Sequence, residues 1–178
     1  MALKATIYKA LVNIADLDQQ YYGELNLTLA QHPSESDKRM MVRLVAYILN
    51  AQERLEFTKG LSEDGEPEIW LKDYTGDIEL WIELGRPDET RLRKASHKSQ
   101  QVLLYCYDEK ASEVWWKNHQ HKLRDYKNLS VFAINDEQLA GVSTMIERTM
   151  QLQATIEDEQ LWLSNSDKSQ LIDVIKLK

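Results

Sequence analysis

The segment DIELWIELG, residues 77–85, restricts the fold more than any other, because apolar and polar side chains alternate along its whole length. This period of two predicts a strand with one apolar face. Residues 68–74 form a second strand-like segment, and Thr75-Gly76 between the two predicts a tight two-residue turn. Together the segments predict an antiparallel hairpin.

A two-residue turn at Thr75-Gly76 sets the register of this hairpin and places Glu68 opposite Glu83 on one face. The same register pairs Trp70 with Trp81 and Lys72 with Glu79, the latter as an ordinary ion pair. Two carboxylates about 5 Å apart repel, and a divalent cation or a shared proton would relieve the repulsion. Mg²⁺ prefers oxygen ligands, so the pair predicts a magnesium site. The alternative is that both glutamates point to water and splay apart.

On such an exposed pair, Glu83→Gln would remove one of two repelling charges. The metal-free protein is then expected to gain a few tenths of a kcal/mol to about 1 kcal/mol of stability.

The rest of the chain predicts an α/β protein with a mixed sheet flanked by helices. Residues 5–14 and 24–30 alternate as strands, and an amphipathic helix is expected from Ser34, as N-cap, to about Glu56. Further helices are expected over 87–99 and 110–123 and from about 136, and further strands over 102–107, 129–134, 150–156, 161–163 and 171–175. A strand, a helix and a second strand that follow one another in the chain imply a parallel crossover connection. The last strands are expected to join the first two in an antiparallel layer, within a single domain over 1–178.

Composition restricts the partners and the location. The formal net charge of −7 opposes binding of nucleic acid through its phosphates, except at a local basic helix over residues 86–98. The start of the chain lacks a basic leader and an apolar run, and no segment is apolar enough to cross a membrane, so a cytoplasmic location is expected. Cys106 lies in the apolar run VLLYCY and is expected to be a buried thiol.

Several segments resemble the YaeQ family of bacterial proteins: MALKATIYKA, HPSESDKRMMVR, NAQERLEFTKGL, EPEIW, LWIELGRPDETRLRKA, the Trp115-Trp116 pair and RTMQLQATI. The resemblance covers the whole chain. It implies a fold similar to the PD-(D/E)XK nuclease superfamily, with a restriction-endonuclease-like core and extra strands at both ends. In that core a helix, a three-stranded meander, a helix and a further strand surround a magnesium ion. No activity is established for the family as a whole.

The resemblance assigns roles to the hairpin acids. Glu68, which follows Pro67, and Glu83 match the two metal-binding acids of the superfamily. The lysine expected two residues after the second acid is replaced by Gly85. By resemblance to divergent members, a lysine from the following helix could take its place, with Lys94 as the candidate.

Arg91 and Lys98 lie beside Lys94 at helical spacing and are candidates for phosphate contacts, although a solvated flank of the helix also explains all three residues. A further helix acid corresponds by resemblance to Glu53. Helical geometry instead places Glu56 nearer the apolar stripe, so both residues remain candidates.

Two functions follow from these residues. In one, the chain is a magnesium-dependent phosphodiesterase or nuclease. In the other, it is a catalytically inactive nuclease-like scaffold that binds an unknown protein partner or has a regulatory role, which Gly85 and the acidic net charge favour.

Overall fold

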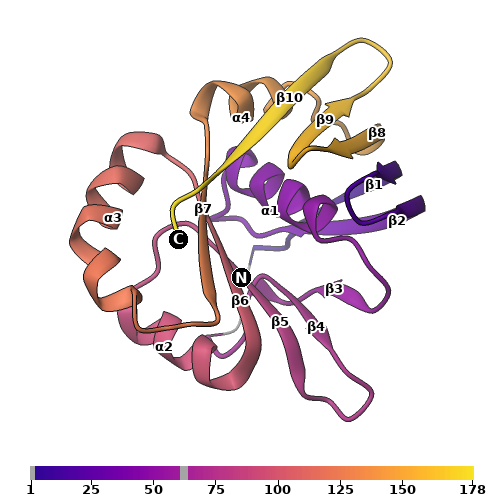
Figure 1. Cartoon of the computed structure of the whole chain (residues 1–178). Coiled ribbons are helices and arrows are strands. Elements are labelled where there is room, and N and C mark those ends of the chain that lie inside the picture. Colours follow the sequence, from indigo (N-terminus) through magenta and orange to yellow (C-terminus); the bar gives the residue numbers. More distant parts are fainter. Residues whose placement is uncertain (1–2, 61–63) are drawn as a thin grey trace. The chain divides into compact units, whose positions relative to one another are not determined.

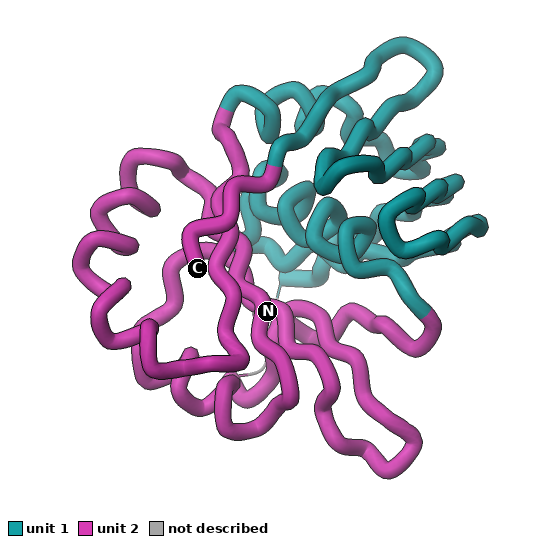
Figure 2. The backbone as a smooth tube through the Cα atoms, viewed as in Figure 1, with its two compact units in different colours: residues 1–52, 137–173 teal, residues 53–136, 174–178 magenta. Residues whose placement is uncertain are grey.

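The computed structural model describes residues 3–60 and 64–178. Over these residues the chain has a mixed α/β fold with ten strands and four helices (Figure 1). It divides into two compact units, residues 1–52 with 137–173 and residues 53–136 with 174–178 (Figure 2). The single domain over 1–178 stays a prediction. No helix in the described part of the chain is long and apolar enough to cross a membrane.

The first unit contains strands in the order β2-β1-β8-β9-β10. Their bounds are β1 Thr6–Asp16, β2 Tyr21–Gln31, β8 Thr149–Glu157, β9 Gln160–Ser164 and β10 Ser169–Lys176. The predicted strands at both ends of the chain are confirmed. The expected antiparallel layer is wrong at one junction, because β8 runs parallel to β1. β8 follows helix α4, Asp136–Ser143, and a crossover allows the parallel direction that a hairpin forbids.

Helix α1, Asp37–Leu49, also lies in the first unit. It begins at Ser36, whose hydroxyl accepts from the backbone N–H of Arg39 at 3.1 Å, and not at Ser34. The expected extension to Glu56 is wrong, because α1 ends at the C-cap Asn50. The Asn50 side chain donates to the carbonyl oxygen of Ala46 at 2.8 Å, and Arg54 has a φ of +67°, which does not continue a right-handed helix.

The second unit contains the order β7-β6-β5-β4-β3, with the end of β10, residues 174–176, paired to β7. Its elements are β3 Leu55–Phe57, β4 Ile69–Lys72, β5 Ile78–Leu84, α2 Glu89–Lys98, β6 Ser99–Cys106, α3 Glu109–Leu123 and β7 Leu129–Ile134. β5, β6 and β7 are parallel, which confirms the predicted crossovers through α2 and α3. Both helices contribute apolar residues to a core that includes Trp81, Leu104 and Cys106. The expected burial of the Cys106 thiol is confirmed, and burial raises its pKa to about 12.

Candidate functional site

The hairpin loop is longer than predicted. The backbone N–H of Asp73 donates to the carbonyl oxygen of Asp77 at 2.9 Å, so three residues form the loop instead of two. The carboxylate of Asp73 accepts from the backbone N–H groups of Thr75 and Asp77 at 2.8 and 2.9 Å. Gly76 has a φ of +95°, which other residues rarely adopt. The aspartate cap and the glycine together stabilise the three-residue loop.

A bulge corrects the register beyond the loop. Lys72 pairs with Ile78, and the register then shifts before Leu71 pairs with Leu80, which leaves Glu79 as an extra residue. The predicted pairing of Lys72 with Glu79 is therefore wrong; Glu79 instead forms an ion pair with Arg54 at 3.4 Å. The loop and the bulge each shift the register by one residue in opposite directions. Because the two shifts cancel, Trp70 pairs with Trp81, and this predicted pairing is confirmed.

Glu68 immediately precedes β4, whose pairing with β5 ends at Ile69 and Ile82. Its backbone N–H donates to the carbonyl oxygen of the same Ile82 at 3.0 Å, and its negative charge acts on the carboxyl of Glu83, so the two acids lie near each other, while their direct pairing stays a prediction. The exposed alternative is wrong, since Glu68 and Glu83 are only 4% and 3% exposed. Gly60 lies against the Glu68 side chain, and a Cβ at Gly60 would come within 2.7 Å of its Oε2 atom. The structure therefore encloses both acids in the second unit.

Glu83 is held by two side chains, those of Trp81 and Arg91. Its Oε1 atom accepts from the indole N–H of Trp81 at 2.8 Å and from Nε of Arg91 at 2.9 Å, and Nη2 of Arg91 lies 2.9 Å from the same oxygen. Arg91 also donates to the carbonyl oxygens of Glu66 at 2.7 Å and Asp64 at 3.3 Å. The guanidinium thus links the carboxylate of Glu83 to the segment that leads into β4.

The first turn of α2 positions Arg91. The carboxylate of Asp88 caps the helix by accepting from the backbone N–H of Arg91 at 2.8 Å. The parallel crossover places this turn just beyond the end of β5. The helix cation that reaches Glu83 is therefore Arg91, where the sequence predicted Lys94. Arginine suits this position because its planar group can bind a carboxylate and backbone carbonyls at once.

Burial raises the pKa of the Glu83 carboxyl above its ordinary value. Hydrogen bonds and charge from Arg91 oppose this effect, as does the bond from Trp81, while the negative charge of Glu68 adds to it. The charge of Glu68 therefore acts on Glu83, and Arg91 is the group that most strongly favours the ionised form of Glu83.

The other candidate residues form no hydrogen bond or ion pair with these acids in the described part of the chain. Lys94 and Lys98 are exposed on α2 and contact no hydrogen-bond or salt-bridge partner within the described ranges. The placement of Glu53 and Glu56 on a helix is wrong: Glu53 lies exposed in a turn, and Glu56 lies on β3. Glu56 accepts from the indole N–H of Trp70 at 2.6 Å. The catalytic roles of Lys94 and Glu53 stay predictions.

Gly85, which stands in place of the superfamily lysine, adopts a φ of +88°. Gly85→Lys is expected to cost about 1–2 kcal/mol, because a side chain is disfavoured in this backbone conformation. A Cβ by itself would fit, since the nearest atom to it is Cε1 of Tyr107 at 3.7 Å. Urea unfolding would measure the loss. Gly23→Lys is the matched control, because an added Cβ there meets nothing within 4 Å and φ is not positive; an equal loss in both variants would contradict the backbone explanation.

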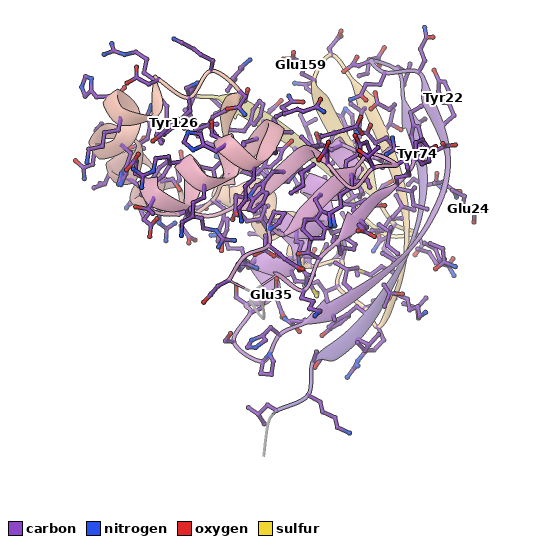
Figure 3. The ribbon with its side chains drawn as sticks, turned by 90° about the horizontal axis from the view of Figure 1, so that it is seen from below. Tyr22, Glu24, Glu35, Tyr74, Tyr126 and Glu159 are labelled. Atoms are coloured by element: carbon purple, nitrogen blue, oxygen red, sulfur yellow. The ribbon has the colours of Figure 1, made fainter. Side chains whose placement is uncertain are left out.

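A second buried charged cluster, in the first unit, was missed by the sequence analysis. Glu35 lies between β2 and α1 (Figure 3), and its Oε2 atom forms an ion pair with Nη2 of Arg43 at 2.9 Å. Nε of Arg43 donates to Oε1 at 3.2 Å, and Arg39 lies 3.0 Å from the same oxygen. The spacing of one acid and two arginines at four-residue intervals is the signal that could have identified it.

Comparison with known proteins decides the family. A family model described as YaeQ protein matches residues 1–174. The chain belongs to the YaeQ family. It is 53% identical over 171 residues to the uncharacterized protein YaeQ of Escherichia coli strain K12, covering 96% of this chain and 94% of that one. The uncharacterized YaeQ of Salmonella typhi is 53% identical over 166 residues, covering 93% and 92%.

Crystal structures of two YaeQ proteins have the same fold. The one from Xanthomonas axonopodis pv. citri has a TM-score of 0.94 and 41% identity, with 98% of both chains covered. The one from Pseudomonas syringae has a TM-score of 0.93 and 29% identity, with coverage of 98% of this chain and 96% of that chain. The YaeQ resemblance inferred from the motifs is confirmed.

Proposed function

We propose that Glu68, Glu83 and Arg91 form the binding site for a divalent cation and a phosphate ester, in a divergent metal-dependent phosphodiesterase of the nuclease-like type. The observation that carries this proposal is the enclosure of two carboxylates beside one fixed arginine. Trp81 and Arg91 hold only Oε1 of Glu83, and within the described ranges Oε2 accepts no hydrogen bond. A fixed first oxygen orients the second toward a further ligand.

The number of protein ligands limits this site. In the described ranges, no three or more His, Cys, Asp or Glu side chains are arranged to hold a metal ion. Mg²⁺ commonly binds one or two carboxylates and completes its shell with water and substrate phosphate. Two acids are therefore compatible with a weak site that is completed by substrate.

The chemistry expected of this arrangement follows from the charges. A bound divalent cation would activate water and neutralise charge on the phosphate. Arg91 is the nearest guanidinium and would contact a phosphate oxygen, since charge-assisted bonds of this kind are strong. Lys94 and Lys98, at helical spacing on α2, would contact neighbouring phosphates of a nucleic acid. Because the chain as a whole is acidic, only a short stretch of nucleic acid would contact the protein.

The element order supports a restriction-endonuclease-like core as part of this proposal. α1 is followed by the antiparallel strands β3, β4 and β5, then by α2 and the parallel strand β6. This agrees with the helix, meander, helix and strand expected from the resemblance. The cytoplasmic location remains part of the same proposal.

A second candidate function is a catalytically inactive scaffold that binds a protein partner. It is favoured by a specific contact, because Arg91 already compensates the charge of Glu83 without a metal ion. Gly85 also lacks the ammonium that would act on water or phosphate.

Calorimetric titration with Mn²⁺ and Mg²⁺ tests the metal site. Wild type is expected to bind in the millimolar range, and Glu83→Gln is expected to lose binding because the amide keeps the shape but removes the charge. Glu157→Gln, an exposed position on β8, is the control and should bind as wild type does. Absence of binding in wild type would contradict the metal site.

Cleavage assays separate the two functions. Labelled single- and double-stranded DNA and RNA would be incubated with each protein and Mn²⁺. Cleavage that is lost in Glu68→Gln supports the phosphodiesterase. Metal binding without cleavage favours the scaffold that binds a partner.

A further inference from the structure

A cavity of about 260 Å³ lies in the second unit, away from Glu68 and Glu83. It is located where β6 and β7 end, beside α3 and the last residues of the chain. Its apolar lining consists mainly of Cys106, Trp116, Ala133, Ile134, Ile175 and Leu177. Ligands of α/β proteins commonly bind beyond the carboxyl ends of parallel strands. A preformed apolar cavity with a few polar groups is typical of a small-molecule site.

The charged groups at this cavity are acidic, beside the uncharged polar side chains of Tyr107, Ser112 and Asn135. Glu109 and Glu113 both line it, and they lie one turn apart on α3. Like charges at this spacing on a helix repel. Within the described ranges neither carboxylate is paired with a cation, and the nearby Arg86 is held by the carbonyl oxygen of Tyr107 at 2.9 Å and by Asp108 at 3.4 Å. The cavity therefore combines an apolar wall with negative charge.

We propose that this cavity binds a small organic cation, a protonated amine on an aromatic or branched aliphatic body. The amine would lie near Glu109 and Glu113, where it relieves their repulsion, and the apolar body would displace water from the wall. Trp116 adds an aromatic ring, which attracts cations as well as apolar groups. An anion of the same shape would be repelled. The proposal is independent of the function of Glu68 and Glu83.

The size of the cavity limits the ligand. Its volume is slightly below the range of about 300–1,000 Å³ that is typical of drug-sized ligands. A single aromatic ring with a short aminoalkyl chain is compatible with this space. Such an amine occurs both in free small molecules and at the amino-terminus of a peptide that begins with an aromatic residue. The amine chemistry is common to both sources.

A matched pair of probes tests the charge. 2-Phenylethylamine and phenylacetate have the same ring and opposite charges, and their binding would be followed by NMR from the methyl signals of Ile134, Ile175 and Leu177. We expect saturable shifts with the amine and none with the carboxylate. Binding of both probes with equal affinity would overturn the proposal.

Variants test the location of the site. The double substitution Glu109→Gln, Glu113→Gln is expected to weaken amine binding about tenfold or more, since it removes both charges and keeps the shape. Ala133→Leu is expected to abolish binding by filling the cavity. Glu157→Gln, Glu159→Gln makes the same charge change on the first unit and should bind as wild type does. Unchanged binding in both cavity variants would overturn the proposal.

A comparison with a peptide shows whether the amine comes from a free small molecule or from a peptide amino-terminus. Phe-Gly-Gly with a free amino-terminus would be compared with 2-phenylethylamine and with its acetylated form. Tighter binding of the free peptide than of the amine supports a peptide amino-terminus as the ligand, and weaker binding supports a free amine. Equal binding of the free and acetylated peptides, with no binding of the amine, would overturn the proposal.

Discussion

Arg91→Met is expected to destabilise the protein by about 2–4 kcal/mol at neutral pH. The substitution leaves Glu83 buried without its cation, and removal of one partner from a buried ion pair commonly costs about 3–5 kcal/mol. The Arg91 side chain is 31% exposed, so water offsets part of the loss. The carbonyl oxygens of Asp64 and Glu66 also lose their donor. Urea unfolding measures the change in the free energy of unfolding.

The loss in Arg91→Met should depend on pH. Burial already raises the pKa of Glu83 above its ordinary value of 4.5, and Arg91 opposes this rise. Without Arg91 the folded-state pKa rises further. A carboxyl with a raised folded-state pKa loses stability as pH increases from the unfolded-state value through the folded-state value. The variant is therefore expected to be less destabilised at about pH 5 than at about pH 8.

Two further variants control this prediction. Glu83→Gln added to Arg91→Met should restore much of the lost stability, because no buried charge then remains unpaired. Arg93→Met changes an exposed arginine on the same helix and should alter stability by less than about 0.5 kcal/mol. A loss in Arg91→Met that is identical at both pH values, and unchanged by Glu83→Gln, would show that the charge of Glu83 is not responsible.

Arg43→Met is expected to destabilise the protein by about 3–5 kcal/mol, because Glu35 would remain buried without its main counterion. The side chains of Arg43 and Glu35 are only 6% and 2% exposed, so water compensates little. Arg43 also donates to the carbonyl oxygen of Ala30 at 3.1 Å, which connects the end of β2 to α1. The free energy of urea unfolding is again the measurement.

The double variant Glu35→Met, Arg43→Met separates charge from packing. If an unpaired carboxylate causes the loss, removal of both groups should recover much of it. A double variant that is as unstable as Arg43→Met, or a single variant that loses less than about 1 kcal/mol, would contradict the expected role of the ion pair.

The environment of Glu83 illustrates a limit of sequence analysis. Alternation placed Glu83 on the polar face of its strand. That placement predicted an exposed pair of repelling carboxylates, in which Glu83→Gln would raise the stability of the metal-free protein. In the structure the glutamate is buried and bound to Arg91, so Glu83→Gln would remove an ion pair as well as the repulsion from Glu68, and the expected gain in stability stays a prediction. A period of two determines which side chains share a face, but it does not determine what covers that face.

Local patterns by themselves determined much of this protein. The periodicity of residues 77–85, the glycine at the hairpin loop and the alternating strands and helices that follow determined the hairpin and the parallel crossovers, because these depend on neighbours in the chain. The pairing of Trp70 with Trp81 was also predicted, although two opposite register shifts produce it.

Only the tertiary structure decided the rest. It decided that β8 pairs in parallel with β1, that Arg91 and not Lys94 reaches Glu83, and that Glu35 is buried against Arg43. These contacts join residues from different elements, and the free energy of a charged group depends on its burial and on every partner that approaches it. Both the burial of a charged group and the partners that reach it depend on how the chain packs. Spacing along the sequence could therefore suggest candidate site residues, but it could not show which of them are in contact.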